Sequence, residues 1–334
     1  MKIKKQNLFI TGIIIFFILA FISVFAGTRG LGFSKGIKAF INFLSGGHID
    51  AGTKLILLKV RLPRVIAAVF CGSALSVAGL ILQTSLNNTL ASPGIIGINS
   101  GAGLFVLAAS VLFPYSVAAR TAGAFTGAAL AVFIVYFISR NAGISKTTLV
   151  LAGVAVSSLM SAVIDVIITM RPEIVADKVA FSLGGFQNLN IGSLYFAVPL
   201  IIICIVILLF LSGGIELFSL GDEAAFGLGL NVNAYRIVSI LISGILAGCA
   251  VSVCGLLGFI GLIVPNFVRL VCRENVRTKI LLTMILGADF LMLCDLISRL
   301  LFYPYELPVG LFLSCLGSPF FIWILISRKK HLSV

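Results

Sequence analysis

The stretch that decides the fold is LFITGIIIFFILAFISVFA, residues 8–26, which holds 19 consecutive uncharged residues, most of them apolar. A helix needs roughly 20 such residues to cross a lipid bilayer. Lys2, Lys4 and Lys5 precede the stretch, as they would in a secretion signal, but the apolar core of a signal spans only about 7–15 residues. The stretch therefore predicts an uncleaved first membrane helix.

The rest of the chain has the same character. Its 334 residues are 60% hydrophobic and only 10% charged, with a mean hydropathy of +1.20, whereas soluble domains are about 25% charged. No aqueous fold has enough interior for this much apolar surface. The apolar runs bounded by charges, prolines or glycines are approximately 8–27, 64–84, 94–113, 117–139, 147–169, 194–212, 235–254, 258–272, 280–300 and 308–326. We therefore expect an all-α polytopic membrane protein with about ten transmembrane helices, in which residues 1–334 form a single transmembrane domain.

Charge predicts the orientation of these helices. Ten crossings put both termini on one side, and the terminal clusters Lys2, Lys4, Lys5 and Arg328, Lys329, Lys330 place that side in the cytoplasm. The first outer loop, about residues 28–63, and the start of the second apolar run nevertheless place seven positive charges on the outside. These are Arg29, Lys35, Lys38, Lys54, Lys59, Arg61 and Arg64. Either the orientation is inverted or an acidic partner docks on this loop, and the terminal clusters favour docking.

The sequence contains no recognisable catalytic motif. It has no HExxH zinc-protease motif, no GxSxG hydrolase motif and no GxxxxGKS phosphate loop, and the surroundings of Asp289 lack the signature of membrane aspartyl proteases. The seven cysteines form no CxxC pair and the two histidines stand apart, so no metal site is expected. We predict no catalytic residue, no metal site and no cofactor bound by this chain.

Three acidic residues fall inside apolar runs, where acids are costly and usually functional. Asp295 precedes Arg299 by one helical turn, so we expect a structural ion pair between them. Asp165 and Asp289 have no partner visible in the sequence. They can be proton-relay groups of a secondary transporter, or they can simply lie near helix ends.

The longest inner loop, about residues 213–233, has the composition of a protein-binding surface. Its sequence from residue 212 is SGGIELFSLGDEAAFGLGLNVN, in which leucines and alanines can line one face of short helices beside Asp222 and Glu223. The pattern Glu223-Ala224-Ala225-x-x-x-Gly229 resembles the EAA loop that permeases of ABC importers insert into a cleft of their ATPase subunits.

Further motifs extend this resemblance over about residues 8–326. They are Arg61-Leu62-Pro63-Arg64 followed by GSALSVAGLILQ, Asn88-Thr89-Leu90-Ala91-Ser92-Pro93-Gly94, GFIGLIVPNFVRL at 258–270, Asp295-Leu-Ile-Ser-Arg299, Glu306-Leu307-Pro308-Val309-Gly310 and LGSPFFIWIL at 316–325. Together they resemble the FecCD-type permeases, the family of the vitamin B12 and iron-siderophore permeases. The family usually has NPLA where this chain has Thr89 in second place, and VPH where this chain has Asn266.

The resemblance implies a vitamin B12 permease-like fold in the cytoplasmic membrane. It implies a homodimer or close heterodimer with a path between the copies, two ABC ATPase subunits inside that bind ATP and Mg²⁺, an extracytoplasmic substrate-binding protein outside, and no nucleic acid. The expected cargo is an iron-siderophore. The alternatives are vitamin B12 or haem and, outside the family, a proton-coupled secondary transporter.

The resemblance also suggests roles for individual residues. Asp222, Glu223, Ala224, Ala225 and Gly229 are expected to couple to the ATPase; Arg61, Arg64 and Arg299 to receive the binding protein; and Asn88 and Leu90 to help close the inner gate. Two simpler interpretations stay open. Arg61 and Arg64 can anchor a helix end at lipid headgroups while Arg299 pairs with Asp295, and Asn88 can merely cap a helix break before Pro93.

Overall fold

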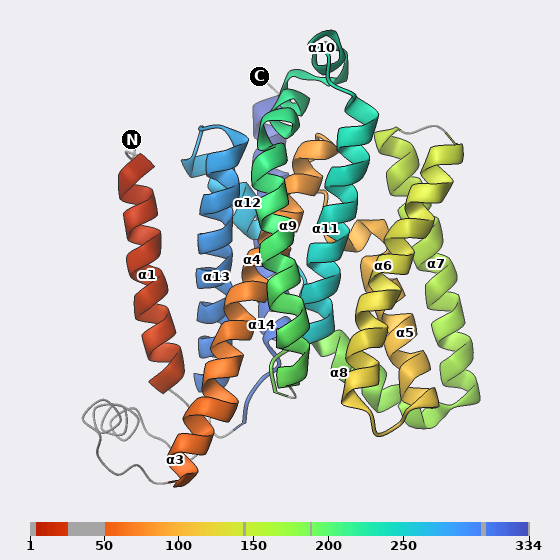
Figure 1. The fold of residues 1–334 in the computed structure, drawn as a ribbon, viewed down its shortest axis with the longest axis vertical. Helices are drawn as coiled ribbons and strands as arrows, with labels where there is room; N and C mark the ends of the chain where they lie inside the picture. The colour runs from red at the N-terminus through yellow and green to blue at the C-terminus, as the bar shows by residue number, and fades with distance from the viewer. Residues whose placement is uncertain (1–4, 26–50, 143–144, 188, 302–304, 333–334) are drawn as a thin grey trace.

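The computed structural model describes residues 5–25, 51–142, 145–187, 189–301 and 305–332, and every regular element in these ranges is helical (Figure 1). Residues 28–50 of the predicted basic loop lie outside the described residues. The all-α prediction is confirmed.

Each of the ten apolar runs corresponds to one helix. These are α1 (Lys5–Phe25), α4 (Leu62–Ser85), α5 (Ile98–Leu112), α6 (Val117–Asn141), α7 (Lys146–Met170), α9 (Ile191–Leu217), α11 (Val232–Cys254), α12 (Ile260–Val271), α13 (Val276–Leu300) and α14 (Val309–Leu332). Within the described residues, seven helical segments are long and apolar enough to cross a membrane. The others, α5, α12 and the described apolar part of α14, are shorter.

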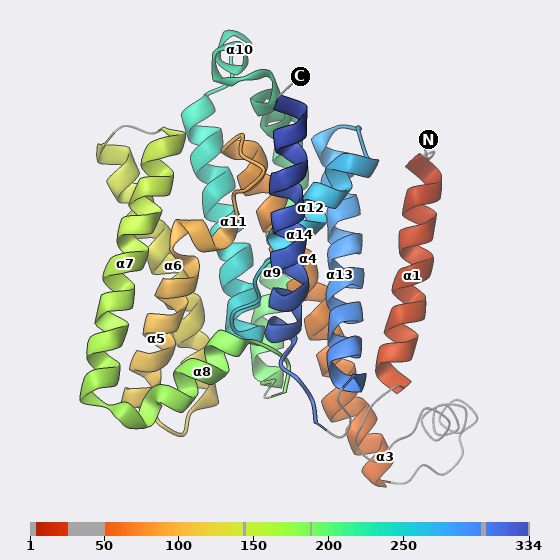
Figure 2. The ribbon, with the colours of Figure 1, turned by 180° about the vertical axis from the view of Figure 1, so that it is seen from behind.

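Short elements connect these helices. They are α3 (Ala51–Leu55), the π-helical turn η1 (Ile56–Arg61), the 3-10 turns η2 (Pro93–Ile96), η3 (Pro172–Ile174) and η4 (Phe218–Leu220), and the helices α8 (Val175–Leu183) and α10 (Asp222–Gly227). The start of α1, the end of α14 and α10 lie at one end of the molecule, and α3 lies at the other (Figures 1 and 2). Following the charge rule, we name the first the inner end and the second the outer end.

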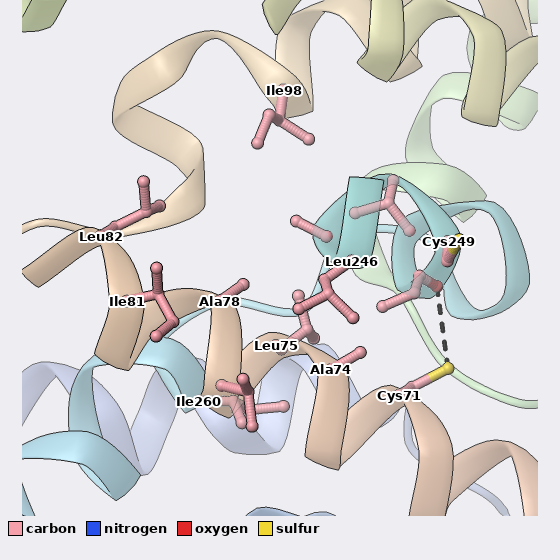
Figure 3. Close-up of a cluster of buried hydrophobic side chains, with 14 of the residues drawn as sticks. Cys71, Ala74, Leu75, Ala78, Ile81, Leu82, Ile98, Leu246, Cys249 and Ile260 are labelled. Carbon is pink, nitrogen blue, oxygen red and sulfur yellow. Dashed lines mark hydrogen bonds between the residues drawn. The ribbon is translucent and has the colours of Figure 1, made fainter. Parts of the chain in front are cut away.

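Helix α4 forms the centre of the bundle and packs against α13, α11, α12 and α9. Small residues let these backbones approach closely, as is typical of membrane helices. A Cβ atom at Gly72 would collide with the Gly287 carbonyl of α13, and one at Gly79 would collide with Gly261 of α12. Figure 3 shows the adjoining apolar core, where Leu75 and Ala78 of α4 face Leu246 of α11.

The predicted outer loop of about residues 28–63 ends earlier than expected. Helix α3, η1 and α4 form one continuous helical segment from Ala51 to Ser85. Pro63 lacks an N–H and crowds the turn before it, and the wider π turn at Ile56–Arg61 accommodates this loss. The expectation of a loop was therefore wrong for residues 51–63.

Helix α8 was not predicted as an element. It has only nine residues and carries Asp177 and Lys178, so it lacks the length and the apolarity of a spanning helix. In the run at 258–272, α12 has only 12 residues, and it continues through Pro265.

Candidate functional site

The predicted coupling loop folds into a short helix that projects from the inner end (Figures 1 and 2). Asp222 and Glu223 lie in the first turn of α10, where negative charge suits the helix dipole. Gly229 ends the helix with φ +82°; its N–H donates to the Phe226 carbonyl at 2.9 Å, and that of Leu230 donates to the Ala225 carbonyl at 3.1 Å. This closure needs a left-handed residue, which explains a glycine at position 229.

The exposed side of α10 is largely apolar. Leu220, Phe226 and Leu228 are 60%, 75% and 64% exposed, and Glu223 and Ala224 are exposed between them. We name these five residues the α10 surface. Ala225, which was predicted to belong to the coupling site, is instead fully buried and attaches the helix to the bundle.

Asp222 also faces the bundle. Its Oδ1 accepts a hydrogen bond from Nη2 of Arg236 at 2.6 Å and lies 3.3 Å from Nζ of Lys146. Partial burial alone would raise the pKa of Asp222, but the hydrogen bonds and charges of Arg236 and Lys146 outweigh it and lower the pKa below its ordinary value. Asp222 therefore anchors α10 to α11 and α7.

The predicted gate residues lie in the turn that follows α4. Asn88 is exposed and Leu90 is half-buried. The Asn88 Oδ1 accepts a hydrogen bond from the Leu90 N–H at 2.9 Å, which is the Asx turn of a helix break. Asn266 of α12 donates from Nδ2 to the Thr89 carbonyl at 3.2 Å, so the two departures from the family pattern contact each other.

The predicted docking arginines are buried at the outer end. Arg64 donates from Nε and Nη2 to Asp295, with the shortest distance 2.9 Å, and from Nη1 to Glu306 at 2.9 Å. The expected Asp295–Arg299 ion pair is present, with Nε 3.1 Å from Oδ2. Arg61 is also buried, and its Nη1 donates to the Val24 carbonyl at 3.1 Å. The expectation that these arginines face outward was therefore wrong, because their guanidinium groups are engaged by α1, α13 and the segment before α14.

Polar side chains also occur on the part of the bundle formed by α6, α7, α8 and α11. A cavity of about 750 Å³ lies among α6, α8 and α11, and Arg120 and Asp177 in its wall form an ion pair at 3.0 Å. On α7, Ser158, Ser161 and Asp165 are exposed along one helix face. Asp165 has a partner that the sequence did not reveal, because Nζ of Lys178 lies 3.3 Å from its Oδ1.

Asp289 keeps its predicted isolation. It is buried on α13, and neither carboxylate oxygen has a hydrogen-bond partner among the described residues. The described residues also contain no cluster of three or more His, Cys, Asp or Glu side chains able to hold a metal ion.

The sequence of this chain matches a family of transport proteins and individual permeases. The model of the FecCD transport family matches residues 14–327. The Fe(3+)-citrate import system permease protein YfmD of Bacillus subtilis (strain 168) is 37% identical over 312 residues, which cover 92% of this chain and 93% of that protein. The hemin transport system permease protein HmuU of Yersinia pestis is 35% identical over 285 residues, covering 83% and 85%.

A solved structure has a similar fold. The inward-facing conformation of a metal-chelate type ABC transporter superposes with a TM-score of 0.83 at 27% identity, covering 96% of this chain and 99% of that one. The family model spans nearly the whole chain, and the helices have the length and composition of membrane spans. This chain is therefore a multi-pass membrane permease that belongs to the FecCD transport family.

Proposed function

We propose that this chain is the permease subunit of an ATP-driven importer that carries a ferric chelate, of the citrate or siderophore type, across the cytoplasmic membrane. The observation that carries the proposal is the 37% identity to the Fe(3+)-citrate permease over nine-tenths of both chains. Import of haem is the second candidate, because HmuU is nearly as similar. Vitamin B12 is the third candidate cargo.

The α10 surface is the proposed docking site for the ATPase subunits, which would bind ATP and Mg²⁺. The α10 surface presents three exposed apolar side chains and one acidic side chain beyond the inner ends of α9 and α11. Exposed apolar patches outside the bilayer mark protein contacts. Within the predicted set, Glu223, Ala224 and Gly229 would contact or shape the docked surface, whereas Asp222 and Ala225 would hold α10 in place.

The path is proposed to run between two copies of this chain, as a homodimer or a close heterodimer. Ser158, Ser161 and Asp165 leave a polar stripe exposed on the apolar helix α7. Polar groups facing lipid are costly, so this face suits a second copy or a water-filled path. Asn88 and Leu90 would close the inner end of that path. Cysteines at these two positions should crosslink across the dimer in only one nucleotide state, whereas crosslinking in every state would favour a plain helix break.

The binding protein is proposed to dock at the outer end. Lys54 of α3 and Lys59 of η1 are exposed there, and they bring positive charge to the outer surface just before α4. Such a field would attract acidic lobes even though the arginines themselves are buried.

The proposal is tested by uptake into proteoliposomes that contain the permease, its ATPases and ATP inside, with the binding protein outside. Iron-55 citrate, an iron-55 siderophore, haem and vitamin B12 are offered in turn. ATP-dependent accumulation of the iron chelates supports the proposal, and accumulation of haem or vitamin B12 alone contradicts the cargo assignment. Uptake that needs no ATP and stops when a protonophore is added would instead favour a proton-coupled carrier that uses Asp289.

A further inference from the structure

Arg236 joins three parts of the inner end. It is the fifth residue of α11 and is only 2% exposed. Its Nη2 donates to Asp222 of α10 at 2.6 Å, and its guanidinium carbon lies 5.7 Å from the centre of the Phe218 ring in η4. Its Nε donates to the Ser85 carbonyl at the end of α4, at 3.2 Å. One buried side chain therefore contacts both the coupling helix and the central helix of the bundle.

The Ser85 carbonyl is suited to such a donor. Helix α4 ends in a closed cap, in which the Asn87 N–H donates to Thr84 at 3.2 Å and the Asn88 N–H donates to Gln83 at 3.0 Å, with Asn87 at φ +48°. This cap pairs the carbonyls of Gln83 and Thr84 and leaves that of Ser85 to an outside donor. A cation is favoured there because the helix dipole is negative at this end.

The turn after this cap contains the predicted gate residues. The turn at residues 86–92 starts directly after Ser85 and carries Asn88 and Leu90. It is held from the other side by Asn266, through the Thr89 carbonyl. The turn is therefore fixed at two points, one on α11 through Arg236 and one on α12 through Asn266.

We infer that Arg236 is a positioning residue that couples movement of α10 to the turn at residues 86–92. This rests on the proposed docking of an ATPase on the α10 surface. Besides η4, α10 packs mainly on α11. The Asp222–Arg236 ion pair connects α10 to that helix, and the same guanidinium group also binds the cap of α4. The planar guanidinium fixes the directions of its donors, which suits it to hold a carboxylate and a carbonyl in a constant relation. When the ATPase displaces α10, Arg236 moves the end of α4 and the turn that follows it.

The test compares four variants in the complete complex of permease, ATPases and binding protein in proteoliposomes. Arg236→Gln removes the charge and the fork, Arg236→Lys keeps the charge, and Asp222→Asn weakens the pair from its half-exposed side. Arg140→Gln is the matched control, because it removes an exposed arginine at the inner end of α6. The readouts are substrate taken up per ATP hydrolysed and, with Asn88→Cys in a Cys315→Ser background, the labelling rate of the new thiol with and without nucleotide.

If the coupling is correct, Arg236→Gln lowers uptake per ATP about tenfold or more, the factor expected for one charge-assisted hydrogen bond. Nucleotide then no longer changes labelling at position 88, although the ATPases stay bound. Arg236→Lys restores part of both readouts, and Arg140→Gln behaves as the parent protein. Where Arg236→Gln fails to fold, Asp222→Asn shows the same change to a smaller degree.

Three results would overturn the inference. The first is an unchanged uptake-to-hydrolysis ratio with normal nucleotide dependence at position 88 in both Arg236→Gln and Asp222→Asn. The second is release of the ATPases by Arg236→Gln, because Arg236 would then only hold α10. The third is an absence of nucleotide dependence at position 88 in the parent. Failure of the docking proposal itself is distinguishable, because Glu223→Arg would then keep bound ATPases and full uptake.

Discussion

The two ends of the bundle both bury arginines, but they use them differently. At the outer end, Arg64 and Arg299 share Asp295, and Glu306 takes a further contact of Arg64, so the described carboxylates are engaged inside one chain. At the inner end, Arg236 is equally buried, yet its carboxylate partner lies on a helix that projects from the bundle. The outer cluster ties α1, α4 and α13 together, whereas the inner one connects the bundle to an exposed surface.

The largest effect should come from opening the outer cluster. Asp295→Ala leaves Arg64 and Arg299 buried without their shared carboxylate, and removal of one partner of a buried pair costs about 3–5 kcal/mol. We expect a large loss of thermal stability in detergent. The control is Glu173→Ala in the exposed Arg171–Glu173 pair, 3.4 Å apart, where a change below about 1 kcal/mol is expected. Equal stability of the two variants would contradict the closed outer cluster.

The second-largest effect is expected from a change in α4, because this helix connects the two ends of the bundle. Gly79→Leu forces a side chain into the backbone of Gly261, and overpacking of this kind costs about 1–3 kcal/mol or more. The yield of folded, membrane-inserted protein should fall. Gly213→Leu is the matched control, because a Cβ atom there meets nothing within 4 Å. If both variants insert equally well, the close α4–α12 approach is wrong.

A smaller effect is expected on capture of the binding protein. Lys59→Glu reverses an exposed charge at the outer end, and such changes act mainly on association, by about tenfold at low salt. Stopped-flow capture should be slower and less dependent on salt. A capture rate equal to that of the parent protein at low salt would remove the docking role from the outer end.

The smallest effect concerns the acidity of Asp222. Because its pKa in the folded protein is lowered, its ion pair contributes stability above the ordinary Asp value of about 3.9 and loses it as the pH falls through the lowered value. The parent protein should therefore melt higher than Asp222→Asn at pH 7, and the difference should shrink below about pH 4. A difference that is constant from pH 7 to pH 3 would show that the carboxylate charge contributes nothing.

The sequence predicted elements more reliably than partners. The ten apolar runs correspond to helices because crossing a bilayer demands a length and a composition that are visible locally. The i, i+4 spacing likewise indicated the Asp295–Arg299 pair. Arg64 reaches Asp295 across 231 positions, and nothing local in the sequence indicates that contact.

The same reason explains the errors at the two ends. Arg61 and Arg64 were expected to face outward because positive charges are unusual in an outer loop, whereas tertiary contacts bury them. No local sequence pattern indicates the role of Arg236, since its partners on α10 and α4 are brought together by the fold. The exposed Phe226 of the α10 surface was not predicted, because the interpretation of this loop rested on its leucines, alanines and acidic residues.

The central claim is that α10 is the contact with the ATPase, and a photo-crosslinking residue placed at Phe226 tests it most directly. Tyr195, 79% exposed near the outer end of α9, is the matched position. In membranes that hold the complete complex, the account predicts a crosslink to the ATPase subunit from position 226 and none from position 195. Absence of an ATPase adduct at 226, or equal adducts at both positions, would contradict it.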